Sequence, residues 1–419
     1  MGRYIRLLFL GIYHFLVHVL LLLLLLIITF FLPKKKNKQQ NNDIIVLSSV
    51  AISYDGRIQK SLLKLEEYFS NVFLVKPKDA AEDLKILAKF DSKNLKILLR
   101  GRAGSYSYIP YCFDLSVFLY IFFSKSSYIY CHDISTCLMG FLVSKLRGKI
   151  LIADLHEWMS ETVEISKIGH VSNLPFYKKT LFESIERVTL KHADHVITVS
   201  EMLSQLIKEK YNLKRTIIIV KNTGSILENI KIEKIEKLKS SCKGINLLYF
   251  GQIQAHRNVE NLIYGLLNCN GFNLWIQGTC PEEYKNKLST IIAGLNLNDR
   301  VTFLPPVSPS EIINAIKKAD VGIMSCKTFS KNLKNSLPNK VFEYIYAEIP
   351  FICEDLPAVK SLVGTPSFIK YFDSNLPDSF MSTLKSVDNK FLNSGGEIKE
   401  FKEKLFYYDD FDKYAMLKK

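Results

Sequence analysis

None of the eight cysteines in the sequence forms a pair with the CxxC spacing that many zinc sites and thiol oxidoreductases use. Most of these cysteines lie in or beside apolar runs. Buried, reduced thiols are typical of cytosolic domains, whereas small secreted domains use their cysteines as a disulfide framework. We therefore expect neither a disulfide framework nor a zinc site built from cysteine.

The sequence also lacks a basic stretch interleaved with aromatic residues, as a single-strand or RNA-binding surface requires. Nucleic acid is therefore not an expected partner. The formal net charge is nevertheless +15, which favours nucleotides, phosphorylated substrates or acidic lipids. With 419 residues, the chain is too long for one ordinary core and suits two α/β domains with a short additional element.

One long hydrophobic run is present near the N-terminus. Leu7–Leu32 is almost wholly apolar, and about 20 such residues are enough for a helix to span a bilayer. The run is longer than the apolar part of a signal peptide and has no small-residue cleavage site, so we expect a retained single-pass anchor. Lysines of the following PKKKNK segment outweigh Arg3 and Arg6, which places the C-terminal domains on the cytosolic face. His14 and His18 are interpreted as tolerated polar residues of this segment.

After the polar linker 37–42, short apolar runs alternate with longer helical patterns, which predicts parallel sheets covered by helices. The predicted strands of the first half are Ile44–Val50, Val72–Val75, Leu95–Leu99, Tyr128–Tyr130, Ile150–Ala153, His195–Val199 and Ile217–Val220, with helices at Ser61–Phe69, Thr136–Leu146 and Tyr177–His192. Those of the second half are Leu247–Phe250, Leu274–Ile276, Val301–Phe303, Val321–Met324 and Phe351–Cys353, with helices at Val259–Leu267, Pro281–Gly294, Ser310–Ala319 and Lys340–Ala347.

The predicted fold class is therefore α/β, with two Rossmann-like domains preceded by one transmembrane helix. We predict an anchor and basic linker over 1–42, the two domains over 43–222 and 243–395, and a C-terminal helix over 396–419 that packs back on the first domain. Ligands bind beyond the carboxyl ends of parallel strands, so two such domains are expected to face a central cleft.

Two segments of the second half carry candidate binding residues just after predicted strands. In the first, Gly251 and Gln252 follow a strand, and Arg257 precedes a helix. A glycine lets the backbone approach a ligand, and an arginine and a helix N-terminus can stabilise phosphate charge. In the second, a turn leads into a helix that carries a glutamate in its first turns, and this carboxylate can accept hydrogen bonds from ribose hydroxyls. The residues of this turn and helix start are Ser336, Leu337, Pro338, Asn339, Lys340 and Glu343. The alternatives are a plain turn with a solvated arginine and a glutamate that only complements the helix dipole.

Together these segments resemble the donor-binding domain of the GT-B glycosyltransferases, specifically the retaining family 4 (glycosyl transferases group 1), throughout Leu247–Val363. The resemblance implies a nucleoside-diphosphate sugar as co-substrate, no cofactor and no required metal. Many members carry an arginine directly after the loop glycine and two glutamates eight positions apart. Here Gln252 and Asn335 occupy the arginine position and the first glutamate position, and we hypothesise that Lys340 supplies the missing positive charge.

The first half resembles the acceptor-binding domain of the same family more loosely. Polar residues follow three of its predicted strands, as Asp55 with Arg57, His132 with Asp133, and His156 with Glu157. A lone histidine at a strand end is more often structural, but two such histidines beside carboxylates favour an acceptor-side site. The resemblance implies that His132 lies near the reacting sugar and that Glu343 holds the ribose, and these two residues are the predicted catalytic pair.

The sequence thus predicts a membrane-anchored, retaining glycosyltransferase that acts on a polyprenyl-diphosphate-linked or other lipid-linked saccharide, in polysaccharide or glycolipid assembly. The alternatives are a nucleotide-sugar epimerase or phosphorylase of the same fold, and a non-catalytic scaffold. Arg100 and Arg102 are weaker candidates for contact with an acceptor diphosphate. Asp410 and Asp412 form a DxD sequence, which we interpret as a coincidence because it lies far from any predicted strand end.

Overall fold

The computed structural model describes residues 41–49, 55–78, 94–102, 115–165, 171–222, 243–308, 311–376, 378–406 and 410–418, together with Leu20 and Ile27. The predicted anchor, apart from these two residues, and the segment 223–242 lie outside the described residues. Within the described parts of the chain, no helix combines the length and the apolar character that crossing a membrane requires.

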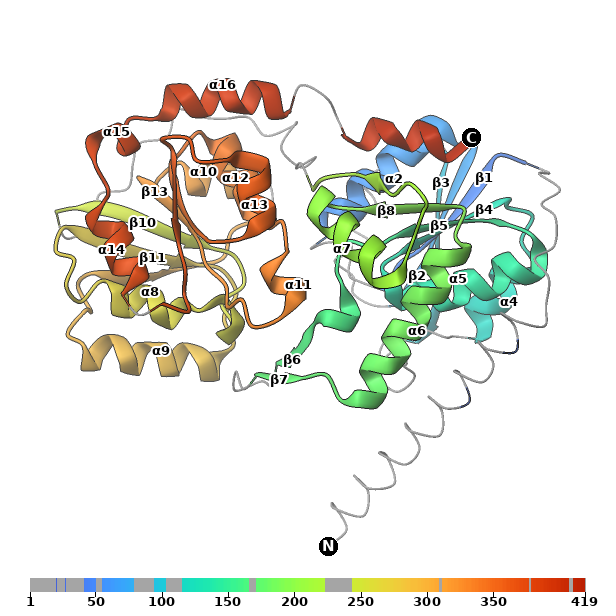
Figure 1. Cartoon of the computed structure of the whole chain (residues 1–419), viewed down its shortest axis with the longest axis horizontal. Coiled ribbons are helices and arrows are strands. Elements are labelled where there is room, and N and C mark those ends of the chain that lie inside the picture. The colour runs from blue at the N-terminus through green and yellow to red at the C-terminus, as the bar shows by residue number, and fades with distance from the viewer. Residues whose placement is uncertain are drawn as a thin grey trace, which may run out of the picture. The chain divides into compact units, whose positions relative to one another are not determined.

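The chain divides into two compact units. The first comprises Met1–Glu161, Leu174–Lys221 and Asp410–Lys419, and the second comprises Thr162–Asn173 and Asn222–Asp409. Each unit contains one large parallel sheet with helices packed against it (Figure 1).

The sheet of the first unit has seven parallel strands in the order β3-β2-β1-β4-β5-β8-β9. These strands are β1 (Asp43–Leu47), β2 (Asn71–Lys78), β3 (Leu95–Arg102), β4 (Tyr128–His132), β5 (Ile150–Asp154), β8 (His195–Thr198) and β9 (Ile218–Ile219). From β1 the chain builds outward to β3 and then returns to place β4 on the other side of β1. Open α/β sheets bind ligands at such a reversal, beyond the carboxyl ends of the strands, which here are β1 and β4.

Helices cover both faces of this sheet. The elements of this part are α2 (Gly56–Tyr68), α4 (Leu115–Phe123), α5 (Ile134–Arg147), η3 (Met159–Glu161), α6 (Phe176–His192) and α7 (Glu201–Tyr211). One buried cluster joins α5 and α6 to one face of the sheet, and a second joins α2 and the C-terminal segment to the other. A short antiparallel hairpin, β6 (Val163–Ile165) with β7 (Val171–Asn173), is grouped with the second unit.

The sheet of the second unit has six parallel strands in the order β12-β11-β10-β13-β14-β15. They are β10 (Ile245–Phe250), β11 (Phe272–Gln277), β12 (Val301–Leu304), β13 (Val321–Met324), β14 (Phe351–Glu354) and β15 (Ile369–Phe372). The helical elements are η4 (Ala255–Arg257), α8 (Val259–Gly265), α9 (Glu282–Gly294), α10 (Ile312–Ile316), α11 (Lys331–Lys334), α12 (Asn339–Ala347), α13 (Pro357–Val363), α14 (Ser379–Lys385), α15 (Asn389–Leu392) and α16 (Gly395–Leu405). The predicted pair of parallel α/β sheets is thus confirmed.

The C-terminal segment differs from the single helix predicted over 396–419. α16 belongs to the second unit, where Phe401 stacks edge-on against Phe368 at 5.4 Å between ring centroids. Only η6 (Asp410–Lys418) belongs to the first unit, where its Phe411, Tyr414 and Leu417 are fully buried against the sheet and α2. The boundary therefore lies between Asp409 and Asp410, because the apolar residues of the segment divide between two cores.

The DxD sequence lies in η6, and both of its carboxylates form ion pairs with lysines. Asp412 pairs with Lys64 at 3.0 Å, and Asp410 pairs with Lys413 at 2.5 Å and with Lys221 at 3.6 Å. These ion pairs give both carboxylates a structural role at the surface of the first unit.

Candidate functional site

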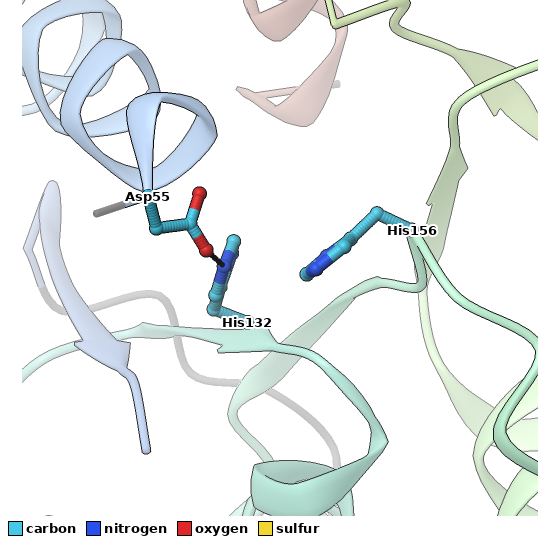
Figure 2. A group of neighbouring side chains, drawn as sticks. All are labelled: Asp55, His132 and His156. Carbon is cyan, nitrogen blue, oxygen red and sulfur yellow. Dashed lines mark hydrogen bonds and ion pairs between the residues drawn. The ribbon is translucent and has the colours of Figure 1, made fainter. Parts of the chain in front are cut away.

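A cluster of carboxylates and imidazoles lies at the carboxyl ends of β1, β4 and β5. Asp55 begins α2 as its N-cap, and its Oδ1 accepts hydrogen bonds from the backbone N–H groups of Arg57 at 3.0 Å and Ile58 at 3.3 Å. Its other oxygen, Oδ2, lies 2.9 Å from Nε2 of His132, the last residue of β4 (Figure 2). The cap fixes the carboxylate and thereby fixes the imidazole, whose side chain is fully buried.

His156 follows β5 and faces His132 within this cluster (Figure 2), with 4.7 Å between the ring centroids. Its Nε2 lies 3.5 Å from Oδ2 of Asp133, the residue that links β4 to α5. Asp133 has a φ of 73°, an uncommon value for a residue other than glycine, and its N–H donates to the carbonyl of Asp154 at 3.0 Å. Four predicted acceptor-side residues therefore lie together, whereas the neighbouring Glu157 is exposed.

Arg57, predicted on the acceptor side, points into the interior instead. Its guanidinium forms a bidentate pair with Asp154, with Nε at 2.9 Å and Nη2 at 2.6 Å from the two carboxylate oxygens. Its Nη1 donates to the carbonyl of Val220 at 2.8 Å. Arg57 is 5% exposed, so its role is to hold the buried Asp154 in place.

Asp154 is a site residue that sequence reasoning did not select. Its Oδ2 lies 3.9 Å from Nδ1 of His132 and also accepts a hydrogen bond from the hydroxyl of Tyr130 at 2.5 Å. The Tyr130 hydroxyl in turn lies 2.7 Å from that of Tyr414 in η6. The signal for Asp154 was its place at the end of a strand, two residues before the predicted His156.

The charges of this cluster shift the pKa values of Asp55, Asp154 and His156 toward their ionised forms. Burial by itself would raise the pKa of Asp55 and of Asp154. The hydrogen bond and the charge of His132 hold the pKa of Asp55 below its usual value, and Arg57 does the same for Asp154. For His156, burial would lower the pKa, but the charges of Asp133, Asp55 and Asp154 raise it. The cluster thus holds ionised carboxylates next to a histidine that favours its protonated form.

A second set of predicted residues lies at the carboxyl end of β10, where that sheet also reverses its strand order. Gly251 has a φ of 121°, and a Cβ built on it would lie 2.7 Å from both Cε and Nζ of Lys340. The backbone here is close-packed on its other side as well, because a Cβ on Gly278 would lie 1.9 Å from the carbonyl oxygen of Gly251. The amino group of Lys340 therefore lies directly over the loop glycine.

The turn before α12 places the remaining donor-side residues. Leu337 is buried, and the hydroxyl of Ser336 donates to the carbonyl of Leu333 at 2.8 Å. Pro338 is the N-cap of α12, which begins at the exposed Asn339 and carries the partly buried Lys340 and Glu343 in its first turns. Gln252 is exposed, and its carbonyl accepts a hydrogen bond from Tyr249 at 2.7 Å. The amide of Asn335 donates to the carbonyl of Lys331 at 2.8 Å.

The electrostatic character of this second set is positive. Burial and the charge of Arg257 lower the pKa of Lys340, and burial raises the pKa of Glu343. Burial and the charges of Arg257, Lys340 and Lys327 lower the pKa of His256 to about 3. Within the described residues, neither Lys340 nor Arg257 has a carboxylate within 4.0 Å, and Nε of Arg257 is buried without a hydrogen-bond partner. Two such cations form a site for an anion.

A buried carboxyl group at the end of β14 was also missed by sequence reasoning. Glu354 is fully buried, and its Oε1 accepts hydrogen bonds from the N–H and the hydroxyl of Ser374 at 2.9 and 2.8 Å. Its Oε2 has no partner among the residues that the structure describes. Burial raises the pKa of Glu354 to about 7.

The comparisons with known proteins point to one class. Residues 230–370 match the family described as Glycosyl transferases group 1. The O-antigen chain mannosyltransferase RfbU of Salmonella typhimurium is 23% identical over 215 residues, which cover 51% of this chain and 56% of that protein. The match thus spans little more than half the length of this relative.

Solved structures resemble the chain over most of its length. HepE of Anabaena in complex with UDP-glucose has a TM-score of 0.65 at 14% identity, covering 90% of this chain and 98% of that chain. The lipopolysaccharide outer core galactosyltransferase WaaB in its apo form has a TM-score of 0.60 at 16% identity, covering 90% and 99%. The fold is therefore α/β and GT-B-like, and together with the matching segment 230–370 it supports a group 1 glycosyltransferase.

Proposed function

We propose that the protein transfers a sugar from a nucleoside-diphosphate sugar to a saccharide acceptor. The observation that carries this proposal is the pair of cations at the carboxyl end of β10. Lys340 lies over Gly251, Arg257 lies close enough to lower the pKa of Lys340, and neither has a carboxylate within 4.0 Å among the described residues. A diphosphate would neutralise both charges, and the same contacts would stabilise the charge that develops on the leaving nucleotide.

The amino group of Lys340 lies next to the position where many members of the family carry an arginine and this chain carries Gln252. An arginine is absent at Gln252, whose side chain is exposed, but the amino group of Lys340 reaches the glycine directly before it. This geometry supports the hypothesis that Lys340 replaces the missing positive charge. The N–H groups at the start of α12 add further donors for phosphate oxygens, because this end of a helix leaves its first amides unpaired.

Glu343 is proposed to hold the ribose of the nucleotide. Its carboxylate forms no hydrogen bond with any described residue, and it lies one turn after the start of α12. Its two oxygens are therefore available for the vicinal hydroxyls of a ribose. The raised pKa of Glu343 in the unliganded protein reflects burial that two such hydrogen bonds would offset.

On the acceptor side, His132 is the proposed residue nearest to the reacting sugar. Asp55 orients its ring through Nε2, and Asp133 and His156 lie beside it. This arrangement supports hydrogen bonding to sugar hydroxyls by several acceptors that are already held in place. We assign no residue as a nucleophile, and we propose transfer with retention of configuration and without a required metal.

The proposed acceptor is lipid-linked, with polyprenyl-diphosphate saccharides as the leading class, and the proposed location is the cytosolic face of a membrane. Support comes from the apolar segment Leu7–Leu32, from the lysines that follow it and from the formal net charge of +15. The similarity to a protein named as an O-antigen chain mannosyltransferase supports polysaccharide assembly as the setting. Nucleic acid is not a proposed partner.

The test is a screen of labelled nucleotide sugars with the full-length protein in detergent and a membrane lipid extract. We expect label to enter the lipid fraction with one donor, only when the extract is present, and equally well with a metal chelator. Anomeric NMR of the product would show the same configuration as the donor.

Two other outcomes would overturn the proposal. Conversion of the nucleotide sugar in the absence of any acceptor would identify an epimerase. Binding of nucleotide sugars without turnover across the whole screen would identify a non-catalytic protein.

A further inference from the structure

The histidine and carboxylate cluster of the first unit has the composition of a metal site. We propose that Asp55, His132 and His156 bind a divalent cation that prefers nitrogen and oxygen ligands, with Zn²⁺ as the best match. Each of the three side chains offers a ligand atom, and these atoms lie within 4.8 Å of one another. All three belong to the same unit and converge from the start of α2, the end of β4 and the segment after β5 (Figure 2).

The distances in the cluster suit a small ion. Oδ2 of Asp55 and Nε2 of His132 lie 2.9 Å apart. Two ligands of one tetrahedral Zn²⁺ lie about 3.3 Å apart, since each is about 2.0–2.1 Å from the ion. The ion would therefore replace the proton that these two atoms share, with little movement of either residue. His156 would complete the set, since the ligand atoms of all three residues lie within 4.8 Å of one another.

Carboxylates stand behind both histidines, which is the arrangement that metal-binding histidines usually have. Nδ1 of His132 is 3.9 Å from Oδ2 of Asp154, and Nε2 of His156 is 3.5 Å from Oδ2 of Asp133. Nδ1 of each ring is buried and has no hydrogen-bond partner among the described residues. A carboxylate thus lies within 4.0 Å of one ring nitrogen of each proposed histidine ligand.

The charge of the cluster also favours a cation. Asp55, Asp133 and Asp154 bring three carboxylates together, and the nearest cation, Arg57, pairs with Asp154. Imidazoles that bind a metal ion are neutral, so the three carboxylates and Arg57 would then leave an excess of negative charge in a mostly buried space, where it is costly. A divalent ion would offset this excess. Two imidazoles and one carboxylate are a donor set of zinc sites that keep an open fourth position.

Occupancy of this site would have a consequence that rests on the proposed function. An ion held by Asp55, His132 and His156 would occupy the side chains that are proposed to hydrogen-bond the reacting sugar. Zn²⁺ would therefore inhibit the transferase, and a chelator would restore activity without being needed by the metal-free enzyme. The ion would be an inhibitor or regulator at the acceptor side rather than a cofactor.

The experiment is a Co²⁺ titration of the full-length, metal-free protein in detergent, followed by visible absorption and isothermal calorimetry. We expect one Co²⁺ per chain with the intense visible bands of a tetrahedral nitrogen and oxygen site, and displacement of Co²⁺ by Zn²⁺. His156→Gln and Asp55→Asn would each weaken Co²⁺ binding by at least about 10-fold, the scale that loss of supporting residues alone reaches.

The matched control is His192→Gln, which removes a histidine of α6 outside the cluster. His14 and His18 remain in every variant, so any ion that they bind is common to all titrations. Zn²⁺ should also raise the melting temperature of the wild type and of His192→Gln, but not of His156→Gln. This readout shows in addition that the variants are folded.

The proposal is wrong if wild-type protein shows no tetrahedral Co²⁺ spectrum, or if the spectrum and affinity are unchanged in both cluster variants. Neither measurement uses a nucleotide sugar or an acceptor. A failure here is therefore distinguishable from a failure of the proposed transferase activity.

Discussion

In both units, charged side chains lie near the carboxyl ends of the central strands. The units differ in whether these charges are paired within the protein. In the first unit, the charged groups near the carboxyl ends of β1 and β4 contact one another, as Asp55 with His132, and Arg57 with Asp154. In the second unit, Lys340 and Arg257, near the carboxyl end of β10, have no carboxylate within 4.0 Å among the described residues. The charges of the first unit are therefore paired within the protein, whereas those of the second are left for a ligand to neutralise.

This difference makes separate predictions for the two units, and the chain provides a reporter for each. Its two tryptophans are Trp158 in the first unit and Trp275 in the second. Replacing either one with phenylalanine leaves fluorescence that follows the unfolding of one unit. Two-state unfolding of the whole chain then need not be assumed.

The largest effect is a loss of stability, and it is expected when the buried Arg57–Asp154 ion pair of the first unit is broken. Arg57→Met leaves Asp154 ionised and unpaired in the interior, and loss of one partner of a buried pair costs about 3–5 kcal/mol. Urea unfolding followed by Trp158 should show this loss of stability, and the Trp275 signal should change far less.

The matched control for this prediction is Lys64→Met. It breaks the pair with Asp412, which has a side chain 59% exposed, so its cost should be about 0–1 kcal/mol. Equal losses for the two variants would mean that the buried pair does not hold the first site together.

A smaller effect, on ligand affinity, is expected when the positive charge of Lys340 in the second unit is removed. Lys340→Met should weaken binding of a nucleoside diphosphate by about 10- to 100-fold, because a charge-assisted hydrogen bond is worth about 1.5–3 kcal/mol. Calorimetry with a nucleoside diphosphate measures this directly, with Lys399→Met of α16 as an exposed control. An unchanged affinity would refute the role of Lys340.

Lys340→Met should also change how the binding of a nucleoside diphosphate depends on pH. The pKa of Lys340 is lowered in the free protein, and a bound diphosphate would favour the charged amine. Wild-type binding should therefore take up a proton and weaken as the pH rises above the lowered pKa. Lys340→Met should lose this part of the pH dependence, which calorimetry in buffers of different ionisation enthalpy detects.

A further prediction concerns Glu354 in the second unit. Its folded-state pKa is about 7, above the ordinary value of 4.5, so the folded protein holds an extra proton between these two values. Stability contributed by the protonated form is present below pH 4.5 and is lost as the pH rises through 7. Glu354→Gln keeps the acceptor for Ser374 and should stabilise this unit at pH 8 by about 1–3 kcal/mol.

The check is urea unfolding followed by Trp275 at pH 5 and pH 8. The gain in stability should be smaller at pH 5 than at pH 8. A gain that does not change with pH would mean that Glu354 does not titrate in this range.

The order of most strands and helices could be predicted from the sequence, because buried parallel strands are continuously apolar and alternate with amphipathic helices. The nine-residue helix α4 was not predicted, since LSVFLYIFF is almost wholly apolar and shows no helical period. The hairpin β6–β7 and the short strand β15 were also missed. Their sequences, VEI, VSN and IKYF, each include a polar residue and so lack the continuous apolar run by which the other strands were predicted.

Residues of the candidate site could be predicted from the sequence only where their type and their position after a strand indicated a role. His132 and His156 were selected because each follows a strand and lies beside a carboxylate. The Arg57–Asp154 pair joins residues 97 positions apart, and this contact depends on packing that no local pattern records. The approach of Lys340 to Gly251 likewise depends on backbone conformation, namely a φ of 121° at the glycine.

The central claim is that the second unit binds the nucleotide sugar through Glu343 and the two cations beside it. The most direct measurement compares sugar transfer by Glu343→Gln with transfer by Glu348→Gln, at a saturating acceptor concentration. Glu348 lies at the other end of α12, where it pairs with Lys402. We predict that Glu343→Gln lowers kcat/KM for the donor by about 10- to 100-fold, as expected for charge-assisted hydrogen bonds, and that Glu348→Gln stays near wild type. Near wild-type transfer by Glu343→Gln would contradict the account.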